Sequence, residues 1–235
     1  MSHRVAEAPR RFGIQVTQLL CGNVIMGTAV ALLLTARLGL LPLDVLHSAI
    51  AHRTGWTIGG AIIATQAVLL AAYLPAGIRP GIGTVVTSVI PAVVCDTLLA
   101  HLPQPAAFGV RIVLLIAGGA LFAAGVALYL GSGLGELPRD GLMRALQARR
   151  GWNLGYIRIG ADILCLATGW LLIGPAAALT TGAVGMGSIL LATGLGPSIA
   201  RLITTDKTVQ PPAHHVVASP PIQNKDTAIS APSTR

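Results

Sequence analysis

The sequence predicts an all-α membrane protein with six transmembrane helices in two inverted-topology three-helix repeats, each with a short interfacial amphipathic helix. Of its 235 residues, 53% are hydrophobic and only 10% are charged, whereas soluble domains carry about 25% charged residues. Residues 134–155 also repeat residues 38–59, 96 positions earlier, with 11 of 22 positions identical. Because a unit of three spans is odd, the second copy must enter the membrane from the opposite side.

The apolar runs place six spans in order along the chain. Residues 1–11 are polar, and the uncharged run that follows is long enough, at 1.5 Å per residue, to cross about 30 Å of hydrocarbon. The spans are expected at residues 12–36, 57–78, 82–102, 107–131, 153–173 and 185–203. Residues 175–184 could form a loop, a re-entrant segment or part of the last helix.

The membrane domain is therefore expected to cover residues 12–203. Repeat one comprises residues 15–102 and repeat two residues 111–203. Residues 204–235 form a tail rich in Pro, Ser, Thr and Ala, which cannot bury enough apolar surface to fold alone and is expected to be disordered.

Each copy of the repeated stretch predicts a short helix, called here the signature helix. Pro42 and Pro138 fit first-turn positions, and Asp44 and Asp140 suit the positive end of a helix. A glycine follows each helix as a stop signal. In the first copy the apolar residues recur at i, i+3 and i+7 with the polar residues mostly elsewhere, which indicates an amphipathic helix at the membrane surface. The second copy is expected over residues 138–150.

Basic residues predict the orientation, because they concentrate in the cytoplasmic loops of membrane proteins. With the N-terminus inside, ten of them flank the inner ends of the spans and three flank the outer ends. The inner ones are Arg4, Arg10, Arg11, Arg79, Arg139, Arg144, Arg149, Arg150, Arg201 and Lys207, and the outer ones are Arg37, Arg53 and Arg111. We therefore expect both termini in the cytoplasm and contacts between the inner face and anionic lipid.

An ordered set of short elements resembles the YczE/YyaS/YitT-like family of bacterial integral membrane proteins. The elements are Leu134-Gly135, Pro138-Arg139-Asp140, Gly151-Trp152, Arg158, Gly185-Met186-Gly187-Ser188 and Gly196-Pro197. The resemblance covers roughly residues 15–203. It implies a multi-pass protein of the bacterial cytoplasmic (inner) membrane whose molecular activity is largely undefined.

Several polar residues inside the spans form a candidate intramembrane site. Arg158 and Asp162 are four residues apart on one face of the fifth span, so they can pair, either as an internal ion pair that fixes packing or as part of a solute or proton site. Asp96 could reach water at the outer surface or take part in transport. Asn23 and Gln66 suit hydrogen bonds between helices better than ligand binding.

The start of the second signature helix gives two further alternatives. Arg139 and Asp140 could cap the helix and contact lipid phosphate, or they could form a gate or a docking site for a partner. No phosphate loop, HExxH motif or nucleophile elbow occurs, so no enzymatic activity is expected. The three cysteines lie in apolar runs without metal-ligand spacing, so neither a metal nor a cofactor is expected.

Two functions remain from the sequence. The first is a small permease or exporter with its site between the repeats. The second is a non-transporting membrane factor that docks or regulates another membrane or biosynthetic complex through its basic inner helix and tail. Nucleic-acid binding is not expected, because the basic residues lie between apolar segments. The solute, any protein partner and the oligomeric state are not indicated.

Overall fold

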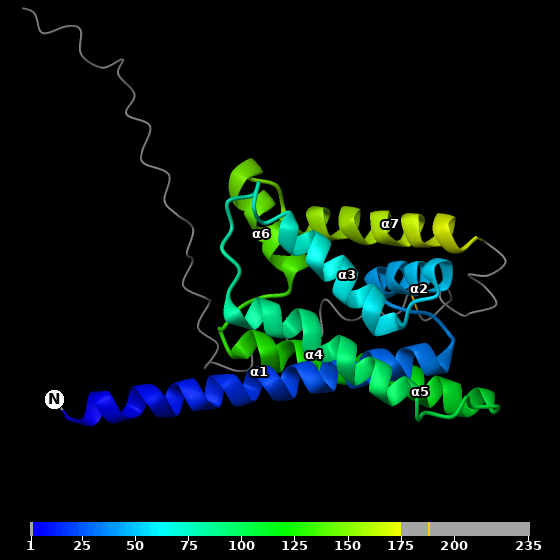
Figure 1. Cartoon of the computed structure of the whole chain (residues 1–235), viewed down its shortest axis with the longest axis horizontal. Coiled ribbons are helices and arrows are strands. Elements are labelled where there is room, and N and C mark those ends of the chain that lie inside the picture. Colours follow the sequence, from blue (N-terminus) through cyan, green and yellow to red (C-terminus); the bar gives the residue numbers. More distant parts are fainter. Residues whose placement is uncertain (1, 175–187, 189–235) are drawn as a thin grey trace, which may run out of the picture.

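The computed structural model describes residues 2–174 and Ser188, and the regular elements in these residues are all helices (Figure 1). In order they are α1 (Ser2–Ala36), α2 (Pro42–Thr54), α3 (Ile58–Ala71), α4 (Ile82–Leu99), α5 (Phe108–Gly131), α6 (Pro138–Arg150) and α7 (Leu154–Ile173). Apart from Ser188, the expected sixth span, the segment before it and the tail lie outside the described residues.

Four of these helices are long and apolar enough to cross a membrane. The candidate spans are Phe12–Ala36 within α1, then α4, α5 and α7. A fifth is possible if α2 and α3, which are bent by 114° at a short break, together form one span. The all-helical class and four of the expected spans are therefore confirmed, with α1 beginning ten residues before its apolar part.

The expected second span, residues 57–78, is wrong in its length. The helix α3 ends at Ala71 and the chain then turns until Gly77. Its 14 residues at 1.5 Å each reach only about 21 Å. The apolar residues continue past Ala71, but Pro75 lacks a backbone N–H and disfavours helix in the residue before it. A proline thus ends the helix where hydropathy alone continues it.

The two signature helices have the expected bounds and the expected signals. Pro42 and Pro138 each occupy the first turn of their helix. Gly55 and Gly151 follow with φ values of 73° and 66°, a left-handed conformation that costs glycine little. The polar face of α2 is only partly exposed, however, because His47 is 2% exposed whereas His52 and Arg53 near the end of the helix are exposed. This helix packs between α3 and α7.

The helices α1, α4 and α5 lie side by side along the long axis of the molecule, while α2, α3 and α7 lie on one side of them (Figure 1). Close packing of α1 against α5 uses glycines. A Cβ on Gly22 would lie 2.7 Å from the Tyr129 nitrogen, and one on Gly118 would lie 2.9 Å from the Leu33 side chain. Since Arg111 Nε donates to the carbonyl of Ala36, the two helices run antiparallel.

Contacts between the two halves are related by the 96-residue repeat. Gly22 and Gly118 are equivalent positions, and so are Leu33 and Tyr129, so the two close contacts of α1 with α5 exchange under the repeat. The contact between α2 and α7 and the contact between α3 and α6 exchange under the repeat in the same way. A Cβ on Gly169 would lie 3.0 Å from Val45, and one on Gly141 would lie 2.0 Å from the Tyr73 hydroxyl.

Two arginines extend this exchange to the ends of the signature helices. Arg53 Nε donates to the carbonyl of Leu172 in the last turn of α7. Its equivalent, Arg149, donates through Nη2 to the carbonyl of Ala76 in the turn after α3. Leu172 and Ala76 are again 96 positions apart, so each arginine binds the matching carbonyl in the other half.

The loop before each signature helix forms a hydrogen bond with a residue of the other half. In one direction, the Gly83 nitrogen donates to the Leu134 carbonyl at 3.2 Å. In the other direction, the Leu40 nitrogen donates to Ser188 Oγ at 3.1 Å. The repeated motifs of the sequence are therefore the points at which the two halves meet.

Candidate intramembrane polar site

Asp162 on α7 pairs with Arg139 on α6, and not with Arg158 as the sequence suggested. Arg139 Nη1 lies 2.7 Å from Asp162 Oδ1, and both side chains are about four-fifths buried. Arg158 is half-buried one turn before Asp162 and forms no ion pair with a described residue. The i, i+4 spacing allowed a local pair, but the partner comes from a neighbouring helix 23 residues away in sequence.

The same arginine joins a second carboxylate and a buried tyrosine. Arg139 Nε lies 3.8 Å from Asp140 Oδ1, and the fully buried Tyr129 hydroxyl lies 3.4 Å from Asp140 Oδ2. Burial acts to lower the pKa of Arg139, but Asp140 and Asp162 outweigh it and raise this pKa above its ordinary value. Arg139 therefore stays charged and holds α6 against α7.

A second tyrosine borders the same cluster from the end of α3. Burial, followed by the negative charges of Glu136 and Asp140, raises the pKa of Tyr73 to about 12. Glu136 itself pairs with Arg144 at 3.0 Å. Each of the three carboxylates in the cluster thus faces one of two arginines, an arrangement that suits a structural role in a region of low dielectric.

Outside this cluster, and besides Asp44 on α2, three buried polar side chains have oxygen atoms without a hydrogen-bond partner in the part of the chain that the structure describes. They are Asn23 Oδ1 on α1, Gln66 Oε1 on α3 and Thr87 Oγ1 on α4. The Asn23 amide does donate to the Leu19 carbonyl at 2.7 Å, but its oxygen accepts nothing. An unsatisfied buried polar atom costs about 1–3 kcal/mol, so these oxygen atoms are expected to find partners beyond the described residues.

Two of these residues, Asn23 and Thr87, lie at the same height along the packed helices α1 and α4. A Cβ on Gly27 would lie 2.6 Å from the Pro91 carbonyl, and Ala31 clusters with Cys95 one turn further on, so α1 and α4 run parallel here. One turn back from Gly27 and Pro91 are Asn23 and Thr87. Their unpartnered oxygen atoms are therefore at the same height between the two helices.

A buried aspartate and histidine form the polar part of α2. Asp44 Oδ1 lies 3.1 Å from His47 Nδ1, while Asp44 Oδ2 and His47 Nε2 have no partner among the described residues. Neither side chain meets an arginine or lysine there.

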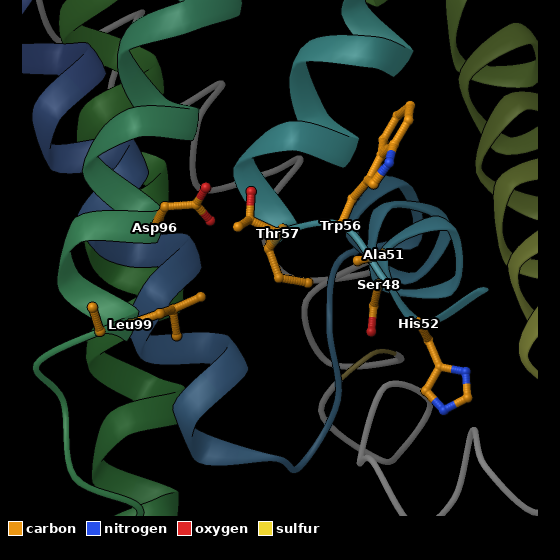
Figure 2. A pocket seen from close by; sticks show the side chains of 9 residues that line it. Ser48, Ala51, His52, Trp56, Thr57, Asp96 and Leu99 are labelled. Atoms are coloured by element: carbon orange, nitrogen blue, oxygen red, sulfur yellow. The ribbon is translucent and has the colours of Figure 1, made fainter. Parts of the chain in front are cut away.

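Asp96 lies at a hollow between α2, α4 and the start of α3. The Asp96 carboxylate points from α4 toward the α2–α3 junction (Figure 2) and accepts the Gly59 N–H at 2.7 Å. The hollow has a volume of about 500 Å³, and its lining residues are Ser48, Ala51, His52, Trp56, Thr57, Ile58, Asp96, Leu99 and Ala100. Asp96 therefore has a partner that its own helix did not reveal.

The predicted polar residues do not form one continuous site. Asp162, Arg139 and Asp140 form a cluster at α6 and α7, whereas Asp96 and Asp44 belong to the region of α2 and α4. The sequence analysis missed Tyr129, Tyr73 and His47 as members of these groups. The sequence could have indicated two of them, because the two repeats differ at these positions. The residues equivalent to His47 and Tyr129 are Met143 and Leu33.

No metal site is evident in the described part of the chain. No group of three or more His, Cys, Asp or Glu side chains there is arranged to hold an ion. The three cysteines are free, and Cys95 is the fully buried one.

Comparison with known proteins agrees with the resemblance predicted from the sequence. The model of a family described as "Family of unknown function (DUF6198)" matches residues 10–204. An uncharacterised protein of Haemophilus influenzae is 30% identical over 181 residues, 77% of this chain and 79% of its own. The uncharacterised membrane protein YczE of Bacillus subtilis is 30% identical over 173 residues, 73% of this chain and 77% of its own. No solved structure matches. The chain therefore belongs to the DUF6198 family of YczE-like proteins.

Proposed function

We propose that this chain is a multi-pass protein of the bacterial cytoplasmic membrane that acts as a small, non-enzymatic permease or exporter. The observation that carries the proposal is the set of unpartnered oxygen atoms on Asn23, Gln66 and Thr87, buried on three different helices. Transporters commonly bind solutes between repeats, where polar groups and broken helices replace continuous apolar spans. The 114° break between α2 and α3 provides such an interruption.

The inverted arrangement of two three-helix repeats belongs to the same proposal. It is supported by the antiparallel packing of α1 against its equivalent α5 and by the contacts that exchange under the 96-residue offset. Six spans follow if α2 with α3 counts as one and the apolar residues 185–203 supply the last. Both termini then lie in the cytoplasm, as the bias of basic residues favours.

The test uses one isosteric substitution and a matched control on the same helix. Thr87→Val removes an unpartnered buried hydroxyl, whereas Thr97→Val removes an exposed one that is bonded to the Val93 carbonyl. The melting temperature of the purified protein is measured alone and across a metabolite library. We expect at least one solute to stabilise the wild type and the Thr97 variant but not the Thr87 variant, which by itself melts no lower than the wild type.

Stabilisation is expected because bound solute shifts unfolding by mass action. The absence of any stabilising metabolite, or its retention by the Thr87 variant with an unchanged midpoint, would contradict the permease proposal. A lower melting temperature of the Thr87 variant without solute would instead mean that the hydroxyl holds the helices together.

A docking or regulatory role is the second candidate, and one observation favours it. The C-terminal half of α6, from Leu146 to Arg150, is exposed, and the Arg150 guanidinium lies 6.0 Å from the centre of the Trp152 ring. A cation and an aromatic ring at a helix end suit the headgroups of anionic lipid or an acidic partner. If Arg150→Gln abolishes the cellular phenotype while Thr87→Val leaves it intact, docking is the better account.

A further inference from the structure

The hollow beside α2 combines an apolar lining with a single acidic residue. Five of its nine lining side chains are apolar: Ala51, Trp56, Ile58, Leu99 and Ala100. The polar ones are Ser48, His52, Thr57 and Asp96, and Asp96 is the acidic residue among the nine. Its volume of about 500 Å³ is within the range of small-molecule sites.

The charge in this region is not balanced by a basic side chain. Asp96 accepts a backbone N–H from Gly59, and that bond leaves the negative charge in place. Asp44 is not a lining residue and pairs with His47 on α2. Arg53 also belongs to α2, and its side chain donates to the Leu172 carbonyl. Neither arginine nor lysine is among the lining residues, so Asp96 is the group that a cation in the hollow would meet.

The rim adds an aromatic surface. Trp56 follows α2, is 56% exposed and lines the hollow at the α2–α3 junction (Figure 2). Indole is the aromatic side chain that attracts cations most strongly. A carboxylate, a tryptophan and apolar walls together match an organic cation that carries both a charge and a hydrocarbon part.

We propose that this hollow binds an organic cation, with the charge of the solute met by Asp96 and its apolar part lying on the wall formed by Trp56, Ile58 and Leu99. This inference rests on the proposed permease function, for which it names the solute class and the entry site. The lining serine and threonine hydroxyls can accept or donate hydrogen bonds to polar substituents of the solute.

The experiment compares a cation with its uncharged isostere. Benzyltrimethylammonium and neopentylbenzene have the same shape and differ in charge, so their effects on the melting temperature of the purified full-length protein isolate the charge. We expect the cation to stabilise the wild type and the isostere to have no comparable effect. Adding salt from about 50 mM to about 500 mM should weaken the cation's apparent affinity, because an exposed charge pair is screened.

Two variants and one matched control locate the site. Asp96→Asn keeps an oxygen that can accept the Gly59 N–H, so α3 retains its cap while the charge is lost. We expect the apparent affinity for benzyltrimethylammonium to fall roughly tenfold. Trp56→Leu should weaken it several-fold, whereas Trp152→Leu, at the equivalent and equally exposed position of the other repeat, should leave it unchanged.

Three results would each overturn the inference. They are equal stabilisation by the isostere, an unchanged affinity for the cation in Asp96→Asn, and an affinity for the cation that does not change with salt concentration. The salt series needs no variant, so the inference stays testable even if Asp96→Asn folds poorly. If a neutral or anionic metabolite stabilises the protein through Thr87 while the cation does not, the permease proposal survives and the cation inference fails. If no solute stabilises the protein, both fail.

Discussion

The two signature helices, α2 and α6, share their length and their caps but hold their aspartates differently. Asp140 on α6 is met by Arg139 and by the Tyr129 hydroxyl. The positions that correspond to these two residues in the first repeat are Leu43 and Leu33, so Asp44 has neither partner. It pairs instead with His47. One carboxylate oxygen of each aspartate accepts no hydrogen bond from a described residue, but that oxygen of Asp140 faces Arg139 at 3.8 Å.

This difference indicates that the two halves have different roles. The network at α6 pairs its carboxylates with arginines, and a buried arrangement of that kind holds helices in one relative position. In the region of α2 the buried Asp44 has a histidine rather than an arginine as its partner, and an atom of each side chain has no hydrogen-bond partner among the described residues, which costs stability. We infer that the second repeat supplies the frame and the first repeat supplies the contacts to the solute.

The prediction with the largest expected effect is that α2 and α6 face opposite sides of the membrane. His52 and Ala148 are equivalent exposed positions near their C-termini. In a background without the three native cysteines, a membrane-impermeant maleimide should label His52→Cys in intact cells and Ala148→Cys only after permeabilisation. The effect is all-or-none, since one side of the bilayer is inaccessible to the reagent. Labelling of both positions from the same side would refute the inverted arrangement.

The next largest effect concerns the ion pair between α6 and α7. Arg139→Leu or Asp162→Leu leaves the other charge stranded in a mostly buried position, and we expect each to cost about 2–3 kcal/mol of the free energy of unfolding. The double variant should cost clearly less than the sum, because no lone charge remains. Reversible unfolding in detergent gives the free energies.

Arg158→Leu serves as the control for this pair. Arg158 forms no ion pair with a described residue, so its loss should change stability by well under 1 kcal/mol, and its combination with Asp162→Leu should be additive. Coupling between Arg158 and Asp162 that exceeds the coupling between Arg139 and Asp162 would restore the partner suggested by the sequence and contradict the structure.

The ion pair also illustrates what a sequence can predict. Helix bounds followed from local signals: Pro42 and Gly55 fix α2, and a second proline and glycine fix α6 in the same way. The partner of Asp162 could not be read locally, because periodicity within α7 identifies neighbours on one helix only. Contacts between helices depend on packing that sequence spacing does not encode.

The burial of polar residues on α2 could not be predicted from the sequence either. An amphipathic pattern predicts an apolar face and a polar face, but not whether a second helix covers the polar one. Here α3 and α7 pack on α2, and His47 becomes buried. The end of α3, in contrast, could have been predicted from the sequence. Pro75 indicates that the helix ends although the apolar residues continue.

A smaller effect tests the exchange of contacts between α2 with α7 and α6 with α3. The first contact places Val45 against Gly169, and the second places Gly141 against Tyr73. Gly141→Val should clash with the Tyr73 side chain and cost about 1–2 kcal/mol. Adding Tyr73→Gly recreates the arrangement of the first contact and should recover part of this loss in melting temperature. A double variant as unstable as the sum of its single changes would mean that the two contacts are not equivalent.

The smallest expected effect comes from the two arginines that end the signature helices. Arg53 and Arg149 each donate to a carbonyl in the other half, at positions that exchange under the repeat. Both side chains are exposed, so water competes for them and salt screens them. A cation at the C-terminal end of a helix contributes about 0.3–1 kcal/mol, and we expect Arg53→Gln and Arg149→Gln each to lower stability within that range. Because the two contacts share no residue, the double variant should be additive. Equal losses would support equivalence of the two halves at their rims, so that the asymmetry of the molecule lies in the surroundings of Asp44 and Asp140. A loss confined to Arg149→Gln would extend the asymmetry to the rims and would favour the second repeat as the frame.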